Sequence, residues 1–106
     1  FDQVLSTDTQ NLNPDSFILG KPYPNPFNPS VEMNLVVDNS GTYQISIHNI
    51  KGELINNWDV NFTQKGNHII QWNAMNYSGS LVPSGVFFIS VTNQNKSKQR
   101  KVLLLR

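Results

Sequence analysis

Prolines crowd one ten-residue stretch of this chain, residues 21–30, whose sequence is KPYPNPFNPS. The stretch holds four of the six prolines in the protein. A proline fixes its own φ, lacks an N–H group and pushes the preceding residue toward extended geometry, so the stretch can neither continue a helix nor lie in the middle of a sheet. We interpret it as a stiff entry to a β-sheet domain, with Tyr23 and Phe27 as packing rings. Display of a proline-rich peptide to a partner with a binding groove is the alternative.

Size and composition limit the chain to one small domain. A chain of 106 residues has no room for a second core. Cysteine is absent, which excludes disulfides, thiolate metal ligands and a cysteine nucleophile. Residues 1–13 lack the basic start and apolar run of a signal peptide, and the longest apolar run, residues 102–105, is too short to span a bilayer. We expect a piece of a larger protein.

The net charge of +1 and the 14% of charged residues do not suggest a nucleic-acid binder, but the charges are unevenly distributed. All seven acidic residues lie at or before Asp59. Five of the eight basic residues lie in the last eleven positions, namely Lys96, Lys98, Arg100, Lys101 and Arg106. Such a basic strip either protects a terminal strand from aggregation or contacts an acidic partner or an anionic membrane surface.

Alternating hydrophobicity predicts strands along most of the chain. Residues 1–16 are polar and are predicted to be a linker, and residues 17–106 are predicted to be the domain. After a short apolar start at residues 17–19, strands are expected near residues 31–37, 43–48, 54–62, 68–72, 86–91 and 97–105, and no window has helical periodicity. About seven short strands predict an all-β fold, an immunoglobulin-like antiparallel β-sandwich without a disulfide. The predicted core is Val31, Met33, Leu35, Tyr43, Ile45, Ile47, His68, Ile70, Trp72, Phe87, Ile89 and Val91.

Residue types that carry catalysis or bind metals are sparse. His48 and His68 are the only histidines, they are expected to face opposite ways, and a zinc site would need a third ligand. His68 shares a face with Ile70 and Trp72, so we interpret it as a hydrogen-bonded residue at the edge of the core. No pair of acidic residues is spaced as a general acid and base, and neither a nucleophile elbow nor a phosphate-binding glycine loop occurs. We expect no enzyme, no metal and no cofactor.

Several short motifs follow one another in a defined order. YPNPFNPS at residues 23–30 precedes an alternating strand, and a basic residue, four aliphatic residues and a terminal arginine close the chain at residues 101–106. Between these ends lie Tyr43, Ile45, Ile47 and Gly52, then Gly66, His68 and Trp72, then Gly79, Val82, Ser84 and Gly85. From about residue 19 onward the chain resembles the type A C-terminal sorting domains of the type IX secretion system. These domains are similar in fold to the immunoglobulin-like domain of flagellar hook-capping proteins. The chain departs from the family pattern only at turn and surface positions, with His48, Asn49, Glu53, Asn73 and Ala74.

The resemblance implies a secretion address. Such a domain ends a cargo protein that has reached the periplasm, where the outer-membrane translocon recognises the folded domain and passes the cargo to the cell surface or the medium. A sortase, which is a partner and a cysteine protease, then cleaves upstream of the domain. The cut would fall in or before residues 1–16. The expected partners are therefore the translocon, the sortase and an N-terminal cargo domain of the same chain, with the domain peripheral to the outer membrane and without nucleic acid.

We expect the translocon to read the proline segment and the last strand. The residues concerned are Tyr23, Pro24, Asn25, Pro26, Phe27, Asn28, Pro29, Lys98, Arg100, Lys101, Val102, Leu103, Leu104, Leu105 and Arg106. If Leu103 and Leu105 face the core, Val102 and Leu104 face outward, and this edge strand would accept a strand from a receptor. If the run is simply buried, removing residues 103–106 would unfold the domain.

Two other functions stay open. Trp58, Phe62 and Tyr77 would form a platform for a sugar ring if they were exposed together, which would make the domain an accessory carbohydrate-binding or adhesion module of an extracellular enzyme. Large aromatic residues in so small a domain otherwise fill the core. The third function is a subunit-interaction domain like that of the hook-capping proteins.

Overall fold

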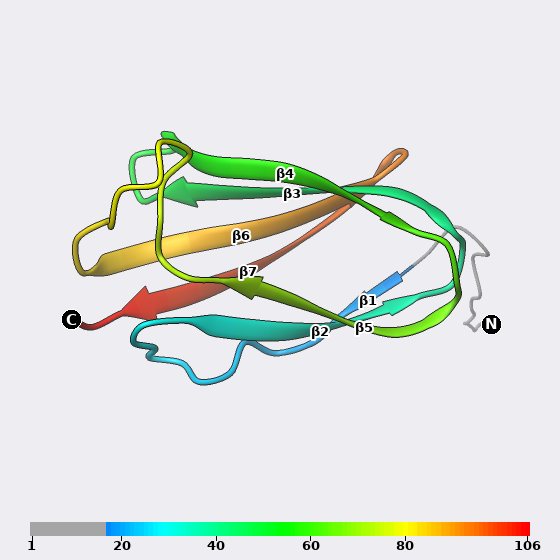
Figure 1. Ribbon diagram of the computed structural model, residues 1–106, viewed down its shortest axis with the longest axis horizontal. Helices are drawn as coiled ribbons and strands as arrows, with labels where there is room; N and C mark the ends of the chain where they lie inside the picture. The colour runs from blue at the N-terminus through cyan, green and yellow to red at the C-terminus, as the bar shows by residue number, and fades with distance from the viewer. Residues whose placement is uncertain (1–16) are drawn as a thin grey trace, which may run out of the picture.

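The computed structural model describes residues 17–106, and these residues form seven strands and no helix (Figure 1). The strands are β1 (Phe17–Leu19), β2 (Val31–Val37), β3 (Gly41–Asn49), β4 (Leu54–Phe62), β5 (Gly66–Trp72), β6 (Gly85–Asn93) and β7 (Lys96–Leu104). The predicted all-β fold is confirmed. This part of the chain accordingly contains no helix of the length and apolarity that a membrane crossing needs. The predicted linker over residues 1–16 lies outside the described residues.

The strands form two antiparallel sheets that face each other. The first sheet has the order β1-β2-β5 and the second has the order β4-β3-β6-β7. Figure 1 shows the two layers stacked with their strands along the long direction of the domain. The chain changes sheets between β2 and β3, between β4 and β5 and between β5 and β6, which is the arrangement of an immunoglobulin-like sandwich.

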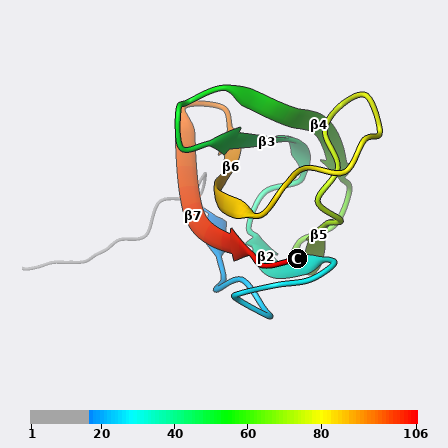
Figure 2. The ribbon, with the colours of Figure 1, turned by 90° about the vertical axis from the view of Figure 1, so that its left-hand side faces the viewer.

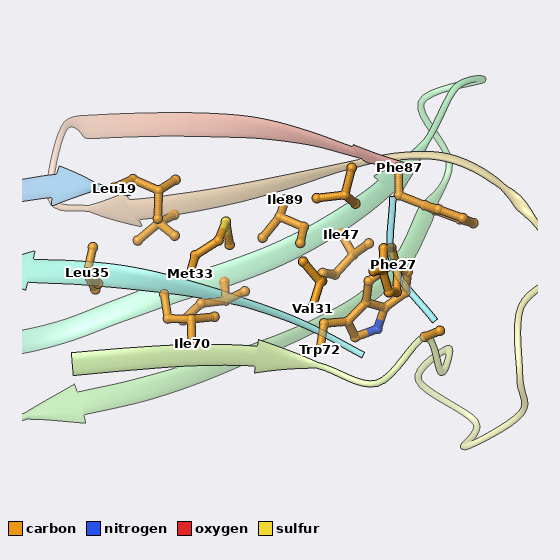
Figure 3. Packing of buried hydrophobic residues seen from close by; sticks show 14 of the residues in the cluster. Leu19, Phe27, Val31, Met33, Leu35, Ile47, Ile70, Trp72, Phe87 and Ile89 are labelled. Atoms are coloured by element: carbon orange, nitrogen blue, oxygen red, sulfur yellow. The ribbon is translucent and has the colours of Figure 1, made fainter. Parts of the chain in front are cut away.

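The core lies between the sheets because alternate residues of each strand point inward. In β2 the side chains of Val31, Met33, Leu35 and Val37 are buried and those of Glu32 and Asn34 are exposed. Every residue of the predicted core is buried except His68, which is half-buried. Figure 3 shows side chains of both sheets meeting in this layer. The core also contains Phe27, which was interpreted as a packing ring, and residues that were not predicted for it, namely Phe17, Leu19, Val37, Ala74, Val82, Val102 and Leu104.

Different turns and loops lie at the two ends of the sandwich. At one end lie the polar turns of residues 38–40, 63–65 and 94–95, and Phe17 enters the domain there, opposite Val37. We call this the linker end. At the other end lie residues 20–30, 50–53, 73–84 and 105–106, which we call the distal end (Figure 1). Figure 2 looks directly onto the distal end, where the chain terminus lies among these loops.

Candidate recognition surface

The proline segment joins the two sheets at the distal end. The backbone of Tyr23 pairs with Glu32 of β2, with N–H···O distances of 2.8 and 2.9 Å. Four residues later the backbone of Phe27 pairs with β7, donating to the Leu103 carbonyl at 2.8 Å and accepting from the Leu105 N–H at 3.1 Å. The segment therefore connects the two sheets through backbone hydrogen bonds to each of them. It is not extended throughout, as the prolines had suggested.

The ring of Phe27 closes the core at this end. Phe27 is 2% exposed, and its ring centroid lies 5.8 Å from that of Trp72, which in turn lies 5.2 Å from Phe87 (Figure 3). Tyr23, by contrast, is 76% exposed. The packing interpretation holds for Phe27 and is wrong for the Tyr23 ring. Because Phe27, one of the two residues between Pro26 and Pro29, is buried, the segment is not a free proline-rich peptide along its whole length.

Asn25 extends the contact between the proline segment and β7. Its side-chain oxygen accepts from the Leu103 N–H at 3.0 Å, and its amide nitrogen donates to the Lys101 carbonyl at 3.2 Å. Together with Phe27, it occupies the outward backbone groups of the C-terminal half of β7. The hypothesis that this half accepts a strand from a receptor is wrong, because its hydrogen bonds are already made within the domain.

Two basic side chains of β7 bind the neighbouring strand β1. Lys98 donates through Nζ to the Phe17 carbonyl and lies 5.4 Å from the centre of the Phe17 ring. Arg100 donates to the Leu19 carbonyl through Nε at 3.2 Å and through a terminal nitrogen at 2.7 Å. These cations therefore join the edges of the two sheets, a structural role that the basic strip did not reveal in the sequence.

The last strand is turned the opposite way from the orientation that the strand-acceptance hypothesis assumed, in which Leu103 and Leu105 faced the core. Val102 and Leu104 are fully buried, whereas Leu103 is half-buried and Leu105 is 52% exposed. The register explains this, because Val102 lies opposite Phe87, an inward residue of β6. Phe27, Val102 and Leu104 were all predicted to be read by the translocon. Because they are buried, they can contribute to recognition only by maintaining the shape of the surface above them. Deleting residues 103–106 would remove buried Leu104, so such a truncation tests folding as well as recognition.

The last residue fixes a hairpin at the distal end. Arg106 donates through Nε to the Val82 carbonyl at 2.7 Å and through a terminal nitrogen to the Ala74 carbonyl at 3.4 Å, and its N–H bonds to Ser84 Oγ at 2.9 Å. Residues 74–82, which lie between two of the predicted strands, form a small hairpin in which the Val82 N–H donates to the Ala74 carbonyl at 3.0 Å. Its turn is held by Asn76 Oδ1, which accepts from two backbone N–H groups at 3.0 Å each.

A second rigid turn stands beside this hairpin. Residues 49–53 form a tight turn in which Asn49 Oδ1 accepts from the N–H groups of Lys51 at 3.0 Å and Glu53 at 2.9 Å. The amide nitrogen of Asn49 donates to a carboxylate oxygen of Glu53 at 2.7 Å. Gly52 has φ of +83°, which a residue without a side chain adopts at little cost. The turn presents Ile50 with 74% of its surface exposed.

The aromatic residues proposed as a sugar platform do not come together. Phe62 ends β4 at the linker end and packs on His68, with ring centroids 4.3 Å apart. Tyr77 lies at the distal end, where its N–H bonds to the Ile55 carbonyl at 2.9 Å. Trp58 is half-buried against the core. The single feature in favour of a sugar site, three exposed rings on one face, is therefore missing.

Each histidine lies on a strand beside residues of the β-sandwich itself. Nε2 of His68 lies 2.9 Å from the Gln64 carbonyl, as expected for a hydrogen-bonded residue at the edge of the core. His48 is half-buried on the outer face of its sheet, next to Phe88 in the register of β3 and β6. Among residues 17–106, no three side chains of the types that bind metals lie close enough to share one ion.

Comparison with known proteins identifies solved structures with this fold. Two solved structures share it: dimeric latent PorU from Porphyromonas gingivalis, and PorZ from the same organism, described as an essential bacterial surface component of the type IX secretion system. PorU gives a TM-score of 0.69 and 17% sequence identity over 89% of this chain, and PorZ gives 0.58 and 24% over 80%. The chain covers only 10% of the PorU chain and 11% of the PorZ chain, so the likeness concerns one domain of each.

No curated protein matches the sequence. The family model of the FlgD Ig-like domain matches residues 27–97, which is more than half of the chain and runs from the buried ring of Phe27 into the last strand. The chain belongs to the FlgD Ig-like domain family.

Proposed function

We propose that this domain is a non-catalytic C-terminal sorting domain of the type IX secretion system. It directs an attached cargo protein across the outer membrane and is then a substrate of the sortase of that system. One observation carries the proposal: the two sequence marks of such domains, YPNPFNPS and the closing basic-aliphatic run, form one structural unit. Asn25 and Phe27 of the first mark hydrogen-bond to Lys101, Leu103 and Leu105 of the second.

This pairing of the two marks explains why a short sorting signal needs a whole folded domain. Asn25 of the first mark bonds to residues of the second mark that lie 76 and 78 positions later in the sequence. The two marks therefore become neighbours only when the sandwich has formed. A receptor that reads this unit therefore selects folded cargo domains. The fold that this domain shares with a domain of PorZ, a surface component of the type IX secretion system, is in line with this route.

The proposal assigns each partner a place. The cargo precedes Phe17 and is attached at the linker end, whereas the unit of the two marks lies at the distal end. The translocon reads the domain on the periplasmic side, and the sortase cuts before the domain once the cargo has reached the surface. The domain itself needs neither a cofactor nor catalytic groups for this role.

A fusion experiment tests the proposal. Residues 1–106 are placed behind a reporter with a periplasmic signal peptide, in a host that has the secretion machinery and in the same host without its translocon. We expect the reporter at the cell surface or in the medium of the first host only. A test variant of the same fusion is Asn25→Asp, which keeps the size of the side chain but replaces the donor to the Lys101 carbonyl with a charged oxygen and should therefore lower export. Retention of the unmodified fusion in the periplasm, together with binding of the purified domain to polysaccharide, would favour the accessory module.

A further inference from the structure

The exposed apolar side chains of the domain gather at the distal end. Of the eight large hydrophobic residues that are exposed within residues 17–106, six lie there: Tyr23, Ile50, Leu54, Tyr77, Leu81 and Leu105. The other two, Ile18 and Ile69, lie apart from them on the outer face of the smaller sheet. Single exposed hydrophobic residues are ordinary, but a concentration of them at one end marks an interaction surface.

A groove lies among these residues. An open cavity of about 350 Å³ separates the 49–53 turn from the end of the 74–82 hairpin. Ile50 and Lys51 line one wall, Val82 and Pro83 line the other, and Ile55 and Phe87 also face it. Ile50 is 74% exposed on the first wall, and Pro83 is exposed on the second. The volume is enough for one or two side chains of a partner.

Both walls are rigid before any partner arrives. Asn49 fixes the first wall and Asn76 fixes the second, each through two hydrogen bonds from backbone N–H groups to its side-chain oxygen. Arg106 ties the hairpin to the end of β7. A preformed groove loses little conformational entropy on binding, which favours recognition of a defined partner.

The charges around the groove indicate what it binds. Lys51 is the only ionisable residue among those that line it, and the guanidinium of Arg106 lies next to its Val82 wall. The nearest carboxylate on the same turn, Glu53, is already paired with the Asn49 amide. An apolar groove with a basic border is complementary to an apolar side chain flanked by a carboxylate.

We propose, on the basis of the function proposed above, that this groove is the docking site for an acidic loop of a translocon protein. The loop inserts an apolar side chain between Ile50 and Pro83 and places a carboxylate at Lys51. Position in the fold agrees with this assignment, because the cargo is attached at the opposite end, where Phe17 enters beside Val37. A partner can therefore reach the distal end whatever the cargo is.

The test compares two double variants of the reporter fusion in the host with the secretion machinery. Ile50→Ser with Pro83→Ser removes one exposed apolar side chain from each wall of the groove. Ile18→Ser with Ile69→Ser removes two isoleucines that are each 61% exposed elsewhere and is the matched control. Circular dichroism and thermal unfolding of each purified domain check that both stay folded. We expect export of the groove variant to fall about tenfold or more, as for the loss of anchoring side chains from an interface, and export of the control to stay unchanged.

A charge reversal and a crosslinking experiment identify the partner. Lys51→Glu should lower export, and Lys51→Arg should not. A photoreactive residue at position 50 should crosslink to a protein of the outer membrane, and one at position 69 should not. Equal export of the two double variants, equal loss of export, or a crosslink from position 50 to lipopolysaccharide would each overturn the proposed site. Failure of the unmodified fusion to be exported would instead overturn the sorting function, and the docking site with it.

Discussion

Replacing Phe27 tests whether the proline segment is part of the folded unit. The ring is 2% exposed and contacts Trp72, whereas the backbone bonds of residue 27 to Leu103 and Leu105 do not need it. Phe27→Ala therefore removes a buried phenyl group and leaves the backbone connection possible. Substitutions of this kind cost about 3–5 kcal/mol, because transfer free energy is lost and a cavity remains.

This cost is large for a domain of this size, because small domains have a free energy of unfolding of about 5–15 kcal/mol. Urea unfolding followed by tryptophan fluorescence measures it, and Trp72 reports directly on the altered site. With a denaturant dependence of about 1–3 kcal/mol per M, the midpoint should fall by at least about 1 M. The slope of the transition should stay the same.

The control lies in the same segment. Tyr23 is also an aromatic residue of this segment but is 76% exposed, so Tyr23→Ala should change the free energy of unfolding by no more than about 0.5 kcal/mol. A loss below about 1 kcal/mol for Phe27→Ala would refute the packing argument, since a ring that fills the core cannot be removed so cheaply. Equal losses for both variants would show that the segment acts through its backbone alone.

Three further variants test other contacts. Arg106→Lys should lose the forked bonds to the 74–82 hairpin, cost about 1 kcal/mol and speed hydrogen exchange at the Val82 amide. Gly52→Ala should cost about 1–2 kcal/mol in thermal unfolding because φ is +83°, whereas a small effect would mean that the turn rearranges. Burial of Tyr43, and next to it the charge of Asp38, raise the pKa of the phenol above 10.0, whereas a backbone hydrogen bond at Asn39 lowers it. The unfolded chain then loses this proton first, so stability should fall as the pH rises above about 10. Tyr43→Phe should abolish this part of the pH dependence in urea titrations, and an unchanged slope would contradict it.

The sequence was sufficient for the strands because the period of two is a local signal. Val31, Met33 and Leu35, and likewise Tyr43, Ile45 and Ile47, alternate with polar residues, and one buried face per strand follows directly. The absence of cysteine and the turn residues between the strands completed the prediction of a sandwich without a disulfide. Family marks such as YPNPFNPS are also local in the sequence and could be found without a structure.

The tertiary structure decided which side of the last strand is buried. An unbroken run of four aliphatic residues has no alternation, so nothing local distinguishes Val102 and Leu104 from Leu103 and Leu105. The pairing of β7 with β6 settles it by placing Val102 opposite Phe87. In the same way, Lys98 and Arg100 looked like free surface charges and proved to bind carbonyl groups of β1, about eighty positions earlier in the chain.

The amino-acid sequence by itself determined the β-sandwich, the core-facing residues of its alternating strands and the location of its two marks, because each of these depends on neighbours within a few residues. Only the folded chain brought Asn25 and Phe27 onto β7 and placed Ile50 and Pro83 on opposite sides of one groove. These contacts depend on the order and register of strands that are distant in the sequence, and hydrophobic periodicity carries no information about that order.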